Sequence, residues 1–176
     1  MPMSHDDEVQ RAQEEELPGP SDLESVLVSE RLSDAMCHPA VIVGVGASVA
    51  EAIAAMQKER RGCVLVVSGD KLTGIFTERD VLLKIAGLSI DLKQAKVSDY
   101  MTRDPVALPA DSSVAFALNR MVVEGFRHIP LVDDQGRPTG VVSMRELIEY
   151  LSDFFRKDML NLPPDPGAAF RNREGG

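Results

Sequence analysis

Two stretches of the chain carry apolar residues at the spacing of one helix face. The first places Val49, Ala52, Ile53 and Met56 at positions i, i+3, i+4 and i+7. The same spacing returns at Val114, Ala117, Leu118 and Met121. This pattern is typical of an amphipathic helix that buries one side. Each predicted helix is followed by two short apolar runs with turn residues between them, which indicates a pair of buried strands.

These two stretches belong to an internal repeat with an offset of 65 or 66 residues. The pentapeptide LSDAM at 32–36 returns as VSDYM at 97–101, and ASVAEAIAAM at 47–56 matches SSVAFALNRM at 112–121. After a one-residue insertion, TGIFTERDVL at 73–82 matches TGVVSMRELI at 139–148. The chain therefore contains two similar units of about sixty residues in tandem.

Each unit predicts the same order of elements: a short polar helix, an apolar segment, an amphipathic helix, two strands and a closing helix. The expected fold class is mixed α/β (α+β), with two β-α-β-β-α motifs packed as a pseudo-twofold pair, because one such unit buries its sheet poorly alone. The predicted boundaries are an acidic arm at 1–27, the first motif at 28–90, the second at 91–155 and a tail at 156–176.

The charge is concentrated at one end of the chain. The net charge is −9, but residues 1–30 contain nine acids and one base, so that segment carries −8 and the remainder −1. The arm is therefore expected to be disordered, and no basic stripe indicates a nucleic-acid partner.

Other features point to a cytoplasmic protein. The sequence contains no apolar run long enough to span a membrane, and its N-terminal stretch lacks the apolar region of a secretory signal. Cys37 and Cys63 fit neither a disulfide framework nor a zinc motif, and the histidines are scattered, so no metal site is expected. The two-glycine stretch VIVGVG lacks the third glycine of a dinucleotide-binding loop.

The end of the second strand carries the candidate chemistry. Thr77 is followed three residues later by Asp80, and Ser143 stands in the same relation to Glu146. A hydroxyl followed at this spacing by an acid forms a capping box at a helix start, as also expected for Ser48 with Glu51. The same groups are able to hold a ligand, because a free helix start attracts anions and a carboxylate accepts hydrogen bonds from hydroxyls. Both interpretations stay open at this stage.

In combination, the repeated SDxM, RHIPLVDD, TGIFTERD and TGVVSMRE segments resemble the CBS (cystathionine-β-synthase) domain family over about 125 residues. The resemblance implies a regulatory module that binds adenosine-containing ligands between paired motifs. It places Asp80 on ribose hydroxyls and Thr77 near phosphate. Ser143 matches the family pattern in the second unit, whereas Glu146 replaces the usual Asp.

Further residues enter as candidates through the same resemblance. Val41 and Ile42 in the first unit, with Val106 and Ala107 in the second, are expected to flank adenine while also serving the core. Arg127 and His128 occupy positions from which related modules reach phosphates, although His128 suits a packed strand equally well. Arg79 and Arg145 recur in both units and are also explained by surface ion pairs. Arg60 and Arg61 are able to serve anions or to solvate a turn, and the solvated turn is the favoured interpretation.

The expected function is non-enzymatic: a module that senses AMP, ADP, ATP or S-adenosylmethionine as a regulatory ligand and requires no cofactor. The chain contains no recognisable nucleophile motif. A homodimer and an unidentified client protein are the expected partners, with no role for nucleic acid or membrane. The alternative is a ligand-independent dimeric scaffold, in which the capping boxes only stabilise helices.

Overall fold

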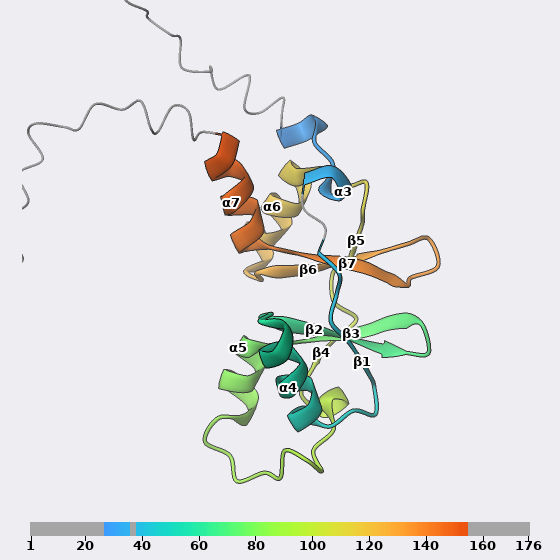
Figure 1. Ribbon diagram of the computed structural model, residues 1–176, viewed down its shortest axis with the longest axis vertical. Coiled ribbons are helices and arrows are strands. Elements are labelled where there is room, and N and C mark those ends of the chain that lie inside the picture. Colours follow the sequence, from blue (N-terminus) through green and yellow to red (C-terminus); the bar gives the residue numbers. More distant parts are fainter. Residues whose placement is uncertain (1–26, 36–37, 155–176) are drawn as a thin grey trace, which may run out of the picture.

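The computed structural model describes residues 27–35 and 38–154. The predicted acidic arm up to residue 26, the predicted C-terminal tail and Cys37 lie outside the described residues. The described chain forms two units of helices and strands that lie one above the other, with most of their helices on one side and their hairpins on the other (Figure 1). This confirms the mixed α+β class and the tandem of similar motifs.

The first unit contains a four-stranded sheet in the order β1-β2-β3-β4. Its elements are β1 (Ile42–Gly44), α4 (Val49–Glu59), β2 (Cys63–Ser68), β3 (Lys71–Thr77), α5 (Glu78–Asp80) and a π-helical segment η1 (Val81–Ile85). The β1 strand runs parallel to β2, and β2 is antiparallel to β3. Ser48 and Glu51 form the expected capping box at the start of α4.

The second unit repeats this plan with a three-stranded sheet in the order β5-β6-β7. Its elements are β5 (Leu108–Pro109), α6 (Val114–Glu124), β6 (His128–Val132), β7 (Pro138–Ser143) and α7 (Met144–Phe154). The repeat extends to details, since both hairpins have a register irregularity at matching positions, Val66/Val67 and Leu131/Val132. Thr77 pairs with Cys63 at the end of one hairpin, as Ser143 pairs with His128 in the other.

The opening segment of each motif packs on the other motif. The first motif opens with α3 (Leu32–Ala35), and Leu32 is fully buried in the apolar core of the second unit. The second motif opens with the 3₁₀ helix η2 (Val97–Asp99), and Val97 and Met101 are buried in the core of the first unit. The two units therefore exchange their opening segments with pseudo-twofold symmetry.

Backbone contacts follow the same exchange. The short strand β4 (Thr102–Arg103) belongs to the second motif and pairs with Gly74 and Ile75 on β3 of the first. His38 forms the corresponding isolated bridge with Val141 on β7. A small apolar cluster that includes Cys63, Leu65, Ile75 and Val141 joins the two units between the sheets.

Candidate functional site

Thr77 and Asp80 form a closed pair where β3 ends and α5 begins. The backbone N–H and the hydroxyl of Thr77 donate to Asp80 Oδ2 over 2.9 and 2.7 Å, and the Asp80 N–H donates back to the hydroxyl over 3.3 Å. Asp80 is only 7% exposed and is the one charged residue buried in the described part of the chain. The capping box expected from the sequence is therefore present.

A lysine neutralises the other oxygen of this buried carboxylate. The Lys84 ammonium lies 2.7 Å from Asp80 Oδ1 and donates to the backbone carbonyls of Tyr100 and Met101 over 2.7 and 3.4 Å. Because Tyr100 and Met101 belong to the opening segment of the second motif, the surroundings of Asp80 are built from both motifs. Sequence reasoning had not selected Lys84.

The corresponding pair in the second motif is held differently. The backbone N–H of Ser143 donates to Glu146 Oε2 over 2.7 Å, and the Glu146 N–H donates to the Ser143 hydroxyl over 3.3 Å. The other carboxylate oxygen lies 2.7 Å from His38 Nδ1 and 3.5 Å from the Arg61 guanidinium. His38 and Arg61 come from the first motif, so this carboxylate also lies where the two motifs meet.

The candidate apolar residues lie just before the first strand of each unit or, for Ile42, at its start. Val41 packs against the core of the first unit, and its carbonyl accepts from the Leu65 N–H over 2.8 Å, whereas Ile42 is 47% exposed. Val106 and Ala107 follow β4 and are half-buried. Through the exchange, the segment that leads to Val106 runs beside β3, the strand that ends at Thr77.

His128 and Cys63 occupy matching first positions on β6 and β2 near the junction of the two units. Burial lowers the pKa of His128, and the nearby Arg127 charge lowers it further, against the opposing effect of Glu78 and Glu146. Burial also raises the pKa of Cys63 to about 12, with the Glu146 charge as a second cause. His128 is therefore neutral at pH 7, and the Cys63 thiol is a poor nucleophile.

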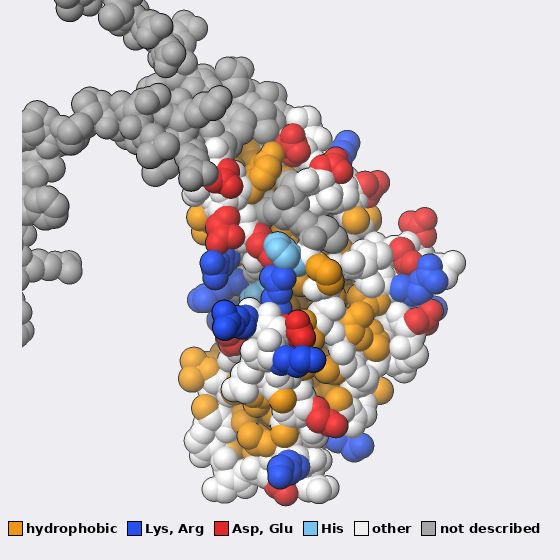
Figure 2. Space-filling model, in the orientation of Figure 1, with side chains coloured by type: hydrophobic (Ala, Val, Ile, Leu, Met, Phe, Trp, Pro, Cys, Tyr) orange, Lys and Arg blue, Asp and Glu red, His pale blue; other side chains and the backbone are white. Residues whose placement is uncertain are grey.

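The two equivalent arginines have different surroundings. Arg79 donates to the backbone carbonyl of Gly125 over 3.1 Å and so links the first motif to the end of α6 in the second. Arg145 is 85% exposed and pairs with Glu149 at 2.7 Å on the surface of α7. Figure 2 shows Lys and Arg side chains gathered near a histidine at the junction of the two halves.

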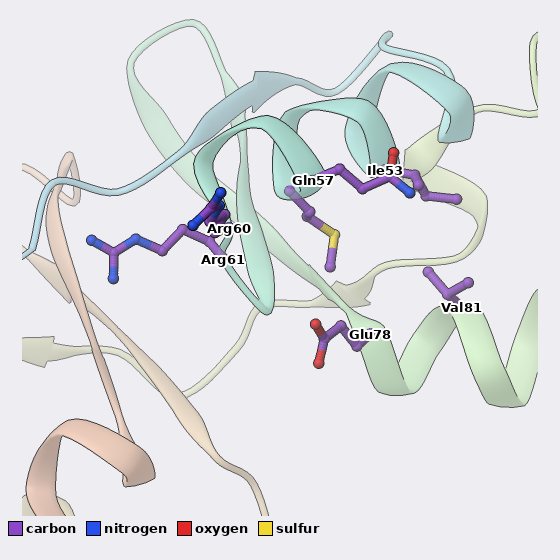
Figure 3. A pocket seen from close by; sticks show the side chains of 7 residues that line it. Ile53, Gln57, Arg60, Arg61, Glu78 and Val81 are labelled. Carbon is purple, nitrogen blue, oxygen red and sulfur yellow. The ribbon is translucent and has the colours of Figure 1, made fainter. Parts of the chain in front are cut away.

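A pocket of about 460 Å³ lies between α4 and α5. Apolar and charged side chains share its wall, as Figure 3 shows: Ile53, Met56, Gln57, Arg60, Arg61, Glu78 and Val81. Glu78 and Val81 line this pocket, whereas Asp80 between them in the sequence does not. Arg60 and Arg61, for which the solvated turn was the favoured interpretation, therefore both line a pocket. The sequence contains one sign that Arg60 is unusual. It ends its helix in the left-handed backbone conformation, at the position where the second unit has Gly125.

Neither a metal-ligand cluster nor a membrane-spanning helix occurs within residues 27–35 and 38–154. Among these residues, His, Cys, Asp and Glu form no group of three that could hold a metal ion. Within the same ranges, no helix combines the length and apolar character needed to cross a membrane.

Comparison with known proteins identifies relatives of differing length. A curated relative, the uncharacterized 17.7 kDa protein in bps2 3'region of Acidianus ambivalens, is 34% identical over 113 residues, which cover 64% of this chain and 67% of the relative. The meiotically up-regulated gene 70 protein of Schizosaccharomyces pombe is 31% identical over 124 residues, or 65% of this chain, but the match spans only 17% of that longer protein.

Solved structures share the fold. The CBS domain protein PAE2072 from Pyrobaculum aerophilum, complexed with AMP, superposes with a TM-score of 0.62 at 22% identity and covers 70% of this chain and 99% of its own. The CBS domain pair of protein MJ0100, in complex with 5'-methylthioadenosine and S-adenosyl-L-methionine, has a TM-score of 0.64 at 21% identity, with 71% and 98% of the two chains covered.

The sequence model of the CBS domain matches residues 32–87 and again 97–153. These two matches cover most of the two repeated units and more than half of the chain. With the exchanged pair of motifs described above, they show that this chain belongs to the CBS domain family.

Proposed function

We propose that this protein is a non-enzymatic regulatory module that binds an adenosine-containing nucleotide at Thr77 and Asp80. The observation that carries the proposal is the buried Asp80 carboxylate, which lies where a strand end of one motif meets the opening segment of the other. A vicinal diol such as that of ribose matches a carboxylate, because two hydroxyls donate to its two oxygens.

The ligand class is supported by what related modules hold. PAE2072 is complexed with AMP, and MJ0100 with 5'-methylthioadenosine and S-adenosyl-L-methionine. Adenosine is the part that these three molecules share. AMP, ADP, ATP and S-adenosylmethionine are therefore the candidate regulatory ligands for this chain, with no further cofactor.

The roles proposed for the other residues are those that the resemblance to the CBS family implies. In the cleft that contains Asp80, Thr77 lies near phosphate, and Val106 and Ala107 flank adenine. In the second cleft, which contains Glu146, Val41 and Ile42 flank adenine. Arg127 and Arg79 attract phosphate, and His128 contributes as a neutral hydrogen-bond donor. Ser143 and Glu146 form the weaker second cleft, because Glu146 carries a longer side chain than the Asp that the family pattern has at this position.

The regulatory output is proposed to pass through a homodimer inside the cell to a client protein. Four large apolar side chains on the helices, Leu82, Leu83, Val122 and Val123, are between 67% and 70% exposed. Exposed apolar helix residues of this kind suit a protein contact. Sedimentation of the full chain distinguishes a dimer from a monomer.

A ligand-independent scaffold is the alternative function, and one observation favours it. Both Asp80 oxygens already have partners, so the capping box is complete without a ligand. In that case Thr77 and Asp80 only stabilise the start of α5, and the pair of motifs serves as a platform for its tails.

Thermal unfolding against AMP, ADP, ATP, S-adenosylmethionine and NAD tests the proposal, with Asp80→Ala as the site variant. A ligand at about 100 times its Kd, bound only to the native state, raises the unfolding free energy by about 2.7 kcal/mol. We expect one adenosine ligand to stabilise the wild type and to lose this effect in Asp80→Ala.

The matched control is Glu51→Ala. It removes the acid of the capping box at the start of α4, which does not belong to the proposed cleft. The ligand-induced shift of each variant is measured from its own ligand-free unfolding temperature, so the stability lost with the helix cap does not enter the comparison. Glu51→Ala should keep the ligand-induced shift. Absence of any shift with millimolar ligand in the wild type would instead favour the scaffold.

A further inference from the structure

The Lys84 side chain connects the two motifs at the candidate ribose position. Its ammonium contacts Asp80 Oδ1 at 2.7 Å, the Tyr100 carbonyl at 2.7 Å and the Met101 carbonyl at 3.4 Å. An ammonium group has three N–H donors, so these three acceptors use its full donor capacity. Lys84 is 41% exposed, whereas the Asp80 side chain is 9% exposed. The lysine therefore covers a buried carboxylate from the solvent side.

The hydrogen-bond capacity of Asp80 is almost filled. A carboxylate offers about four lone-pair positions. Thr77 uses two of them on Oδ2, and Lys84 uses one on Oδ1. One position remains for an incoming group. A ribose that donates both its hydroxyls to Asp80 therefore needs a position that a protein group now holds. The Lys84 ammonium is the group at the exposed end of a flexible side chain, so it is the one that leaves most easily.

This arrangement is confined to the first motif. Lys84 lies in the π-helical segment η1, where the Ala86 N–H donates to the Val81 carbonyl over 2.9 Å. π-helical turns of this kind occur frequently at functional sites. In the second motif the repeat places Tyr150 at the matching position on the regular helix α7, where burial and the nearby Glu30 raise the pKa of its hydroxyl. No lysine pairs with the Glu146 carboxylate within the described ranges.

Displacement of Lys84 also affects the opening segment of the second motif. Tyr100 and Met101 lose the cation on their carbonyls when the ammonium moves away from Asp80. Met101 is 8% exposed in the core of the first unit, so this segment is part of the exchange that joins the motifs. A ligand at Asp80 and the docking of residues 97–103 are thus linked through one side chain.

We propose that Lys84 is an internal competitor for the Asp80 carboxylate, which an adenosine ligand must displace, and that its release loosens the exchanged segment at 97–103. This rests on the proposed function, since it deepens the role of the same cleft. The coupling is reciprocal: whatever holds the segment docked also opposes the ligand. Lys84 is thereby the residue that turns occupancy of the cleft into a structural change between the motifs.

The test compares adenosine and AMP binding by calorimetry to the full-length wild type, Lys84→Met and Lys84→Gln. Methionine keeps the apolar stem without the charge, and glutamine keeps a neutral donor for the Tyr100 carbonyl. We expect both variants to bind adenosine roughly three- to tenfold more tightly, because no cation has to leave. Lys71→Met, an exposed lysine at the hairpin end of β3, is the matched control and should leave the affinity unchanged.

Hydrogen exchange of residues 97–103 provides the second readout. In the wild type, adenosine should increase exchange there, whereas Lys84→Met should exchange faster without ligand and change little when adenosine is added. Unchanged or weaker adenosine binding by both variants would overturn the competitor role. A loss of affinity for AMP alone would also overturn it, because it would assign Lys84 to the phosphate.

The outcomes separate this inference from the proposed function. If the wild type binds adenosine and the variants bind it equally well, only the competitor role fails. If the wild type and both variants bind neither ligand, the proposed function fails as well. If the variants bind adenosine and the wild type does not, the competitor role is supported in its strongest form.

Discussion

Gly74 lies on β3 where the exchanged segment pairs with this strand through β4. A Cβ atom at this position would overlap the sulfur of Met101, and the Met101 side chain is held in the core of the first unit. The absence of a side chain at Gly74 therefore allows the second motif to reach into the first. This requirement comes from packing, since Gly74 has an ordinary strand conformation.

We expect Gly74→Ala to lower the unfolding free energy by about 1–3 kcal/mol, because overpacking forces the buried Met101 to shift. Gly44→Ala is the control. Gly44 also lies in a strand, but a Cβ there would have no atom within 4 Å. Urea unfolding of both variants measures the difference. Equal stabilities would show that Met101 adapts without cost.

Only part of the candidate site could be predicted from the sequence. The spacing of Thr77 and Asp80 predicted their hydrogen bonds, because a capping box is local in the chain. The cations on the two carboxylates were not predicted. His38 and Arg61 reach Glu146 from the other motif, and the contact of Lys84 with Asp80 depends on how η1 is wound. Contacts of this kind depend on tertiary structure that spacing does not encode.

At the scale of elements, α4 and α6 agree well with the sequence pattern. Both run for 11 residues from a serine cap, and each buries the apolar face expected from its periodicity. The helix expected at ERDVLLKIAG differs, because only Glu78–Asp80 is α-helical and Val81–Ile85 forms a π-helical turn. A five-residue change in winding leaves no trace in the apolar periodicity, so the pattern still indicated one continuous helix.

The C-terminal ends of α4 and α6 offer a matched pair of positions for a test. Arg60 ends α4 with φ of 50°, and Gly125 ends α6 with φ of 72°. Left-handed backbone is costly for a residue with a Cβ and free of that cost for glycine. We expect Arg60→Gly to raise the unfolding free energy by about 0.5–1 kcal/mol and Gly125→Ala to lower it by about 1 kcal/mol.

Thermal unfolding of these two variants in the absence of ligand is the measurement. If Arg60→Gly proves less stable than the wild type, the Arg60 side chain contributes more than its backbone strain costs. Arg60 would then have a structural role at the pocket between α4 and α5, which its exposed position does not indicate.

At the scale of the whole molecule, the exchange of opening segments explains why the motifs occur as a pair. The core of the second unit includes Leu32 from the start of the first motif, and the core of the first includes Val97 and Met101 from the second. The sequence indicated only short polar helices for these opening segments, so it predicted neither that Leu32, Val97 and Met101 are buried nor in which core they lie. In the sequence repeat each opening segment belongs to the motif that it begins, whereas in the fold it packs in the core of the neighbouring unit.

This exchange makes a definite prediction about fragments 1–90 and 91–176. The first fragment lacks the apolar side chains of Val97 and Met101, and the second lacks Leu32, which is fully buried. Loss of a large buried side chain costs about 2–5 kcal/mol, which is much of the stability of a small domain. We therefore expect neither fragment alone to unfold cooperatively in circular dichroism, and an equimolar mixture to recover one cooperative transition. A cooperative transition in either isolated fragment would mean that a single motif supplies its own core. The coupling of Asp80 to the neighbouring segment through Lys84 would then act between two independently stable units.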